Sequence, residues 1–240
     1  MAIEKKLSIG KMPRGAKPSP RHKLAAAVPH KILGVTPANI VYIPNTLSFW
    51  GNNNYGDCVT AEEAFAKACN NPEILIPDQT VIGWAQANGY LHGAYLSEVM
   101  DTMATNGFQA NGSTYDDGPY NSVDWTDDSI LQNAISIAPV KIGVAADQLE
   151  NAYNTGSKTN GWFALGFTSD SNEDHCVSLC GYGTLAWLAQ QFNVQLPAGV
   201  DGQAIGYALF TWDSIAIIDK QSVLAITQEA WLRNPTTVIK

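Results

Sequence analysis

The stretch that decides the fold is residues 49–66, FWGNNNYGDCVTAEEAFA. In it a polar, glycine-containing loop leads directly into a segment whose apolar residues recur at helical spacing. These apolar residues are Ala61, Ala64, Phe65, Ala68 and Cys69. Asp57 is a typical N-cap residue, so the helix is expected to begin at Cys58. A thiol there lies at the positive end of the helix dipole, which favours the nucleophilic thiolate. The alternative is a small, buried and inert helix cysteine.

A second informative stretch lies far downstream, at residues 174–183, DHCVSLCGYG. It is typical of a strand that ends in a Gly-Tyr-Gly turn, with His175 at its start. A single histidine is more often a hydrogen-bonded structural group than a base. A cysteine at a helix start combined with a histidine on a distant strand is instead the pattern of Cys–His nucleophilic catalysis.

These two stretches together resemble the papain-like cysteine peptidases. The match comprises Cys58 at the start of a long helix, the His175-Cys176-Val177 strand and the following Gly-Tyr-Gly. The Asn-x-x-x-Gly-Asp-Cys form that begins at Asn52 resembles a bacterial and phage-type branch of that superfamily. The resemblance implies an α+β, two-lobe fold, in which a helical lobe and an antiparallel sheet or barrel lobe enclose a cleft.

The resemblance also implies roles for further residues. Asn52 stands six residues before Cys58, where the family has an oxyanion-hole glutamine, and it offers the same amide on a shorter side chain. The family's histidine is oriented by an Asn in an Asn-Ser-Trp-Gly segment, but residues 210–214 read FTWDS here. We expect Asp213 to accept from His175 Nδ1 as the third catalytic residue. If Trp212 matches the family's shielding tryptophan, Thr211 or Phe210 lies nearer the asparagine position.

Composition limits the remaining choices. The chain has 240 residues, of which 45% are hydrophobic, which suits one globular unit or two lobes sharing a cleft. No apolar run approaches the roughly 18 residues of a membrane span. No secretory signal is visible, so we expect a cytoplasmic protein with reduced thiols. His175, Cys176 and Cys180 lack the spacing of zinc ligands, and we predict no metal and no cofactor.

The charge is divided unevenly along the chain. Residues 1–31 hold eight of the 14 basic residues, opposed only by Glu4, whereas residues 32–240 hold six basic and 21 acidic residues. The eight are Lys5, Lys6, Lys11, Arg14, Lys17, Arg21, Lys23 and Lys31. We therefore divide the chain into a basic, extended arm (residues 1–31) and a papain-like domain (residues 32–240). The arm is expected to lie on its own acidic body, to bind a polyanion, or to be the remnant of a propeptide.

Within the domain we expect a helical lobe over about residues 45–125 and a sheet lobe over about 126–240. Helices are predicted at residues 79–87 and 98–105, with Ser97 as a cap, and a further helix is predicted to be capped by Thr126. Residues 108–125 are rich in Gly, Asn, Asp and Tyr and are predicted to be a surface excursion. Strands are expected at residues 139–144, 162–166 and 205–212, and helices at 185–192 and 222–232.

Three functions fit this pattern. The first is a cysteine peptidase, in which a Cys58 thiolate and a His175 imidazolium act on a peptide or protein substrate. The second is an acyl transferase or amidase that uses a Cys-His-Asp set on the same fold, which amine incorporation would distinguish. The third is a catalytically inactive papain-like protein that binds peptides.

Overall fold

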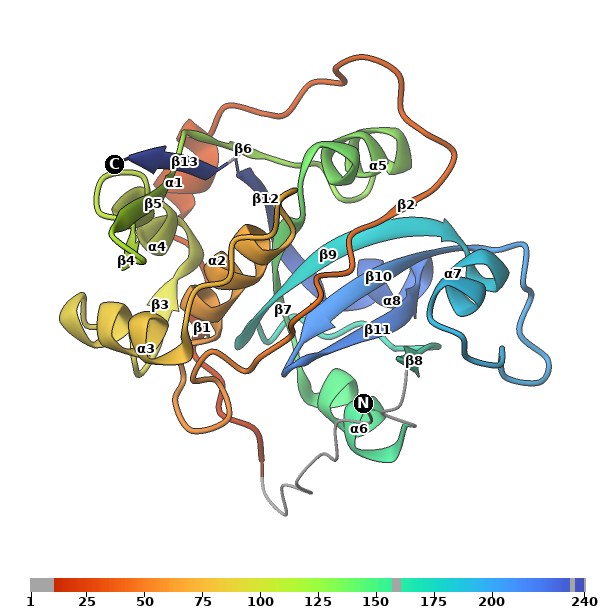
Figure 1. The fold of residues 1–240 in the computed structure, drawn as a ribbon. Coiled ribbons are helices and arrows are strands. Elements are labelled where there is room, and N and C mark those ends of the chain that lie inside the picture. The colour runs from red at the N-terminus through yellow and green to blue at the C-terminus, as the bar shows by residue number, and fades with distance from the viewer. Residues whose placement is uncertain (1–10, 157–160, 234–235, 240) are drawn as a thin grey trace.

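A computed structural model describes residues 11–156, 161–233 and 236–239. Glu4, Lys5 and Lys6 of the arm lie outside these residues. Helices α2, α3 and α4 stand on one side of the molecule and a large twisted sheet stands on the other (Figure 1). Two hydrophobic cores result, one between the helices and the sheet and one on the far face of the sheet.

The large sheet has the strand order β6-β12-β7-β9-β10-β11-β8, and β2 also pairs with β9. Neighbouring strands are antiparallel except for β11 and β8, which are parallel. The strands are β2 (Ile40–Val41), β6 (Tyr120–Ser122), β7 (Val140–Val144), β8 (Trp162–Ala164), β9 (His175–Thr184), β10 (Ile205–Thr211), β11 (Ser214–Asp219) and β12 (Thr227–Arg233).

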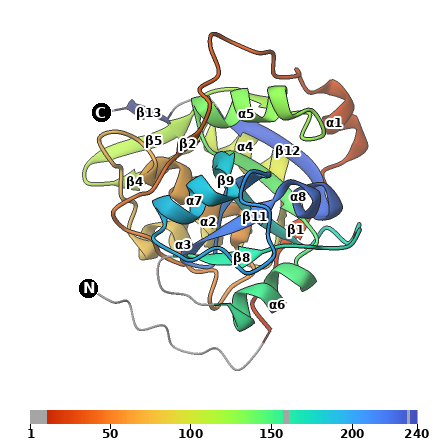
Figure 2. The same ribbon diagram turned by 90° about the vertical axis from the view of Figure 1, so that its right-hand side faces the viewer.

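The helical side contains α1 (Arg21–Ala26), α2 (Cys58–Ala68), α3 (Asp78–Ala87) and α4 (Leu96–Met103). A small sheet of β4 (Phe108–Ala110), β5 (Ser113–Asp117) and β13 (Thr236–Ile239) flanks them, and β1 (Ala16–Lys17) pairs with β3 (Ala94–Tyr95). Helices α5 (Asp128–Ile137), α6 (Asp147–Thr155), α7 (Leu185–Gln191) and α8 (Lys220–Ile226) surround the large sheet (Figure 2). In the described part of the chain, no helix has the length and apolarity needed to cross a bilayer.

Helix α2 is the element on which the two sides meet, and nearly all of its side chains are buried. Phe65 stacks flat on Phe210 of β10, with ring centroids 3.9 Å apart. Burying an aromatic pair of this size contributes strongly to stability, because apolar area removed from water is worth ~25 cal/mol per Å². The Cys58 end of α2 is therefore fixed against the sheet.

Charged side chains also join α2 to the sheet. Glu63 pairs with Lys141 of β7 and, at 2.9 Å, with Arg233 of β12, and these three side chains are at most 3% exposed. Arg233 also donates to the carbonyl of Glu62 (3.0 Å), and Lys141 donates to that of Val59 (3.2 Å). The cations hold the pKa of Glu63 well below its ordinary value despite its burial. A buried carboxylate with two cationic partners stays charged, so the contact has one defined geometry.

The secondary structure predicted for residues 108–125 and 222–232 is wrong. The polar stretch at residues 108–125 forms β4, β5 and β6, because Asn111 and Gly112 both adopt positive φ and make a tight hairpin. The predicted helix at residues 222–232 ends at Ile226, and β12 follows, with Ala230 and Leu232 in one core and Trp231 in the other. Such alternation is typical of a strand buried on both faces.

The caps also differ from expectation. Helix α4 begins at Leu96, before the predicted cap Ser97, and α5 is capped by Asp127 rather than Thr126. The Asp127 carboxylate accepts from the backbone N–H groups of Ser129 and Ile130. The helix that begins at Cys58 and the strands around residues 139–144 and 205–212 are found where they were predicted.

We expect Glu63→Gln to lower the free energy of unfolding by about 3–5 kcal/mol, because Lys141 and Arg233 would remain buried without a carboxylate. Urea unfolding followed by tryptophan fluorescence measures this change. The control is Lys23→Gln, which removes the Lys23–Asp101 ion pair (2.8 Å), in which both side chains are 45% exposed. That change should cost under about 1 kcal/mol. Equal losses in the two variants would contradict a structural role for the buried pair.

Candidate active site

Cys58 is the first residue of α2, and its side chain is 1% exposed. Asp57 occupies the N-cap position as predicted, but its side chain makes no capping hydrogen bond. Burial raises the pKa of Asp57 to about 7, which reduces its negative charge near neutral pH. Gly51 has a φ of 103°, and a Cβ there would lie 2.4 Å from Asp57 Oδ2. The loop before Cys58 therefore depends on glycine at this position.

His175 is the first residue of β9 and is fully buried. Its Nε2 lies 2.8 Å from Thr211 Oγ1, and its ring stacks on Trp212 at 4.6 Å between centroids. Among the described residues, His175 Nδ1 has no hydrogen-bond partner. If the Nε2–H donates to Thr211, the lone pair is on Nδ1, where it can accept a proton.

The turn after Thr211 explains this arrangement. Trp212 and Asp213 have φ values of 45° and 61°, and they link the paired residues Thr211 and Ser214. A two-residue hairpin of this kind needs two positive φ values, which are strained for a tryptophan. The hydroxyl of Tyr153 donates to the Trp212 carbonyl at 3.2 Å. The turn holds the indole ring of Trp212 over His175. The hydrogen bond described for His175 is with Thr211, which the sequence suggests as the alternative to Asp213 for orienting the histidine.

Asn52 lies in the loop before Cys58 and is 3% exposed. Its Nδ2 donates to the carbonyl of Tyr55 at 3.0 Å and to the carbonyl of Pro13 at 3.3 Å. Pro13 belongs to the basic arm. An amide beside Cys58 thus donates to the carbonyl of a peptide chain that comes from elsewhere in the sequence, which is the chemistry of an oxyanion-hole donor.

The arm lies directly on Cys58. Gly15 packs so closely on Gly56 that a Cβ on Gly15 would lie 1.7 Å from the Gly56 carbonyl oxygen. The carbonyl of Gly15 accepts from Ala94 N–H at 2.8 Å, so β1 pairs in parallel with β3. On the other side, Ala16 N–H donates to the carbonyl of Asp174 at 3.2 Å. Two adjacent arm residues therefore bridge β3 and the residue before His175 (Figure 1).

Arg14 anchors this part of the arm. Its guanidinium contacts Asp147 and Asp174, each at 2.6 Å, and also Glu150, and its side chain is 8% exposed. Further along, Lys23 pairs with Asp101 at 2.8 Å. Three carboxylates around one arginine make the Arg14 contact much stronger than an isolated surface ion pair.

Burial governs the protonation of the site. It raises the pKa of Cys58 to about 12, against the opposing effect of hydrogen bonds from the backbone of Cys176 and Gly15. Burial, with a smaller contribution from Arg14, lowers the pKa of His175 to about 3. At neutral pH the covered site thus holds a neutral thiol and a neutral imidazole, not the ion pair expected from the sequence.

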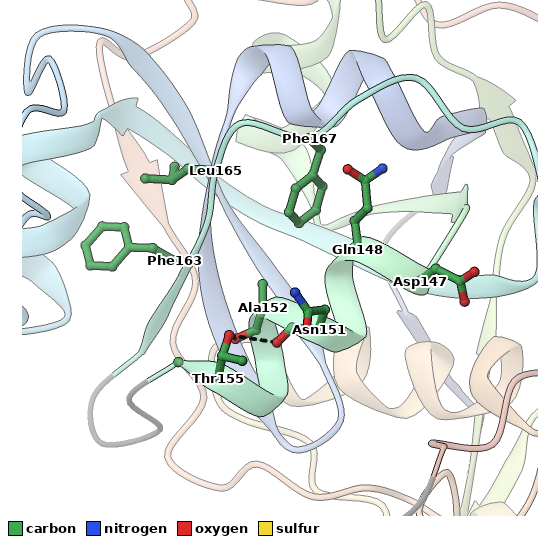
Figure 3. A pocket seen from close by; sticks show the side chains of 9 residues that line it. Asp147, Gln148, Asn151, Ala152, Thr155, Phe163, Leu165 and Phe167 are labelled. Carbon is green, nitrogen blue, oxygen red and sulfur yellow. Dashed lines mark hydrogen bonds between the residues drawn. The ribbon is translucent and has the colours of Figure 1, made fainter.

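A separate hollow of about 450 Å³ lies between α6 and β8 (Figure 3). Its lining includes Gln148, Asn151, Phe163 and Phe167, and neither Cys58 nor His175. Its lining also includes Asp147, which is an Arg14 partner. Within the described ranges, no cluster of three or more His, Cys, Asp or Glu side chains is arranged to hold a metal ion.

Sequence reasoning singled out Cys58, His175 and Asn52 as candidates, and the structure places all three around the arm. It did not identify Arg14 and Gly15. Only the concentration of basic residues in residues 1–31 pointed toward the arm, and no local pattern distinguishes Gly15 from other loop glycines.

Comparison with solved structures gives the fold its name. Xylellain, a cysteine protease from Xylella fastidiosa, has a TM-score of 0.61 at 11% identity, over 95% of this chain and 98% of that one. Digestive procathepsin L 3 of Tenebrio molitor has a TM-score of 0.59 at 14% identity, over 88% and 75% of the two chains. Neither a protein-family profile nor a curated protein sequence matches. These likenesses confirm the α+β papain-like fold predicted from the sequence.

We expect Gly15→Val to dislodge the arm and to speed the alkylation of Cys58 by iodoacetamide, at about pH 6, by at least about tenfold. The valine side chain would collide with the Gly56 backbone, which cannot move away without disturbing the start of α2. Intact-mass spectrometry followed by peptide mapping measures the rate at Cys58.

The pH dependence should change as well. In the native chain the raised pKa of Cys58 makes the rate climb with pH, because the thiolate fraction grows about tenfold per pH unit below the pKa. The uncovered variant should react at a nearly constant rate between about pH 5 and 8, as a thiolate–imidazolium pair does. The control is Gly83→Ala, since a Cβ at Gly83 meets nothing within 4 Å. An equally slow reaction in a Gly15→Val protein whose arm has become protease-sensitive would contradict this account.

Proposed function

We propose that this chain is a cysteine peptidase that hydrolyses peptide bonds in peptides or proteins. Cys58 is the nucleophile and His175 is the general base and acid. Asn52 and the Cys58 backbone N–H stabilise the oxyanion, and Thr211 orients His175. The substrate takes the place now held by residues 12–16 of the arm.

The observation that carries this proposal is the way in which the site binds a peptide backbone. The arm offers the Pro13 carbonyl to Asn52 Nδ2 and the Ala16 N–H to the Asp174 carbonyl, while Gly15 lies against Cys58. Each contact uses main-chain atoms of the arm, which any extended peptide possesses. The same groups are therefore able to hold a substrate of different sequence.

The first chemical step follows from the two neutral groups. The Cys58 Sγ–H proton passes to His175 Nδ1, and the Sγ electron pair forms a bond to the scissile carbonyl carbon. The carbonyl oxygen becomes an oxyanion, which accepts from Asn52 Nδ2–H and from the Cys58 backbone N–H. That N–H is free of an intrahelical partner because Cys58 begins the helix.

The second step breaks the C–N bond. The His175 imidazolium returns its proton to the departing amine, which leaves an acyl group on Cys58 Sγ. Water then attacks the thioester, His175 takes a proton from that water, and the acid is released as the Cys58 thiol is restored. The stacked Trp212 ring covers one face of the imidazole and keeps it in one orientation.

Acyl transfer and simple peptide binding receive less support. The transfer hypothesis depended on Asp213 as the partner of His175, whereas the His175 contact described is with Thr211. The binding hypothesis gives no reason for a buried His175 Nδ1 that has no hydrogen-bond partner among the described residues.

The central test is hydrolysis of a mixed fluorogenic peptide library by the Gly15→Val protein, with the native chain in parallel. We expect Gly15→Val to be the more active, and Cys58→Ala and His175→Ala in that background to be inactive. Asn52→Ala should lower kcat by about 10²–10³-fold, the usual cost of losing one oxyanion donor. The matched control is Asn54→Ala, since Asn54 lies in the same loop and is exposed.

The same assay with an added primary amine separates hydrolysis from acyl transfer. Hydrolysis predicts free acid as the product at every amine concentration, whereas a transferase would yield mainly the amide. A Gly15→Val protein that alkylates rapidly at Cys58 but cleaves no peptide would contradict the proposal.

We expect Thr211→Val to lower kcat by roughly 3- to 10-fold with little change in KM, because one neutral hydrogen bond that orients His175 is lost. Thr211→Ser should restore most of the rate and the acid limb of the pH profile. Asp213→Asn should leave kcat nearly unchanged. A large loss in Asp213→Asn together with a small loss in Thr211→Val would reassign the third catalytic residue to Asp213.

A further inference from the structure

Two carboxyl groups lie next to the site and take no part in the proposed mechanism. Glu173 precedes His175 by two residues, and Glu229 lies on β12. The two side chains lie side by side against Gly143, and the residues are only 8% and 2% exposed. Two buried acids in contact are costly, because like charges so close cannot both ionise without a compensating partner.

The arm uses one hydrogen-bond acceptor of this pair. Ser19 N–H donates to Glu229 Oε1 at 3.0 Å, and the Trp231 indole N–H donates to Glu229 Oε2 at 2.6 Å. Glu173 Oε1 is buried and has no hydrogen-bond partner among the described residues. Departure of the arm would therefore leave two acceptor oxygens open, one on each acid.

The neighbouring strand leaves room for the pair. A Cβ on Gly143 of β7 would lie 2.1 Å from Glu173 Oε1 and 3.0 Å from Glu229 Cγ. Because Gly143 has no side chain, the Glu173 carboxyl can lie against the backbone of β7. In the described part of the chain, no Lys or Arg forms an ion pair with either acid.

We infer that the Glu173–Glu229 pair binds the cationic side chain of a lysine or arginine in the peptide substrate, once the arm has left. The inference rests on the proposed function, since it names the substrate class of the same site. A guanidinium or ammonium group supplies N–H donors to the two open oxygens and balances the charge of the pair.

The protonation of the pair is consistent with this role. Burial, and next to it Glu229, raise the pKa of Glu173 to about 9. At neutral pH the Glu173 carboxyl of the covered site therefore keeps its proton, which an entering cation would displace. Because Glu173 and His175 are two residues apart, at most about 7 Å of chain separates them, so the cationic residue lies near the scissile bond.

The test compares peptides that carry arginine or citrulline at each position around the cleaved bond in turn. Citrulline has nearly the same shape but no charge. In the full-length chain with Gly15→Val, we expect kcat/KM to favour arginine by about tenfold or more at one position. The isosteric Glu173→Gln/Glu229→Gln protein should show an arginine-to-citrulline ratio within about threefold of unity.

The single variants Glu173→Gln and Glu229→Gln should give intermediate ratios, and they keep the test decisive if the double variant folds poorly. Asp201→Asn is the charge-matched control, since Asp201 is exposed and lies outside the site. Hydrolysis with an equal rate on arginine and citrulline peptides at every position would overturn the inference and leave the proposed function standing.

A binding measurement separates the two claims when no hydrolysis is seen. In the Cys58→Ala, Gly15→Val chain, calorimetric titration with the arginine and citrulline peptides gives their Kd values directly. A preference for arginine of about tenfold that is lost in the double Gln variant supports the acidic subsite even in an inactive protein. Equal Kd values, or no binding of either peptide, would overturn it.

Discussion

The contact of Glu63 with Lys141 and Arg233 is the constraint on which the rest of the structure depends. It lies beneath α2, away from water, and fixes the helix that carries Cys58 to two strands of the sheet. Apolar packing such as Phe65 on Phe210 supplies much of the stability but tolerates small shifts. A buried carboxylate between two cations tolerates almost none, because any displacement leaves a charge unpaired. Cys58 is therefore placed relative to β9, and hence to His175, by electrostatics as well as by packing.

A short segment of the arm, residues 14–17, covers this site. The arm makes main-chain contacts with β3 and with Asp174, and Arg14 adds contacts with three carboxylates. Cys58 and His175 are buried, so the charged forms of both are disfavoured. In the proposed mechanism the Cys58 thiol loses its proton, so departure of the arm would favour both substrate access and ionisation by exposing these two side chains to solvent.

Local sequence signals located the helix at Cys58 and the strand at His175, because capping and periodicity are short-range properties. The role expected for Asn52 came from the family resemblance alone. The local signals did not locate features that depend on tertiary context. Residues 227–232 contain the residues of a possible helix but alternate between two cores, and only the neighbouring strands reveal this. The contact between His175 and Thr211 depends on tertiary context in the same way. It lies beside a turn with positive φ values at Trp212 and Asp213, which the residue types there do not predict.

In the fold, basic residues of the arm pair with acidic residues of the rest of the chain. The basic arm meets an acidic body, and the carboxylates that hold Arg14 stand at one end of the covered segment while Glu173 and Glu229 stand near Ser19 at the other. An acidic body that retains its own basic arm also attracts other cationic chains, because the field does not distinguish their origin. The cationic substrate proposed above would therefore compete with the arm for the same surface. What separates them is Gly15, whose close packing on Gly56 lets the arm lie nearer to the site than a chain with a side chain at that position.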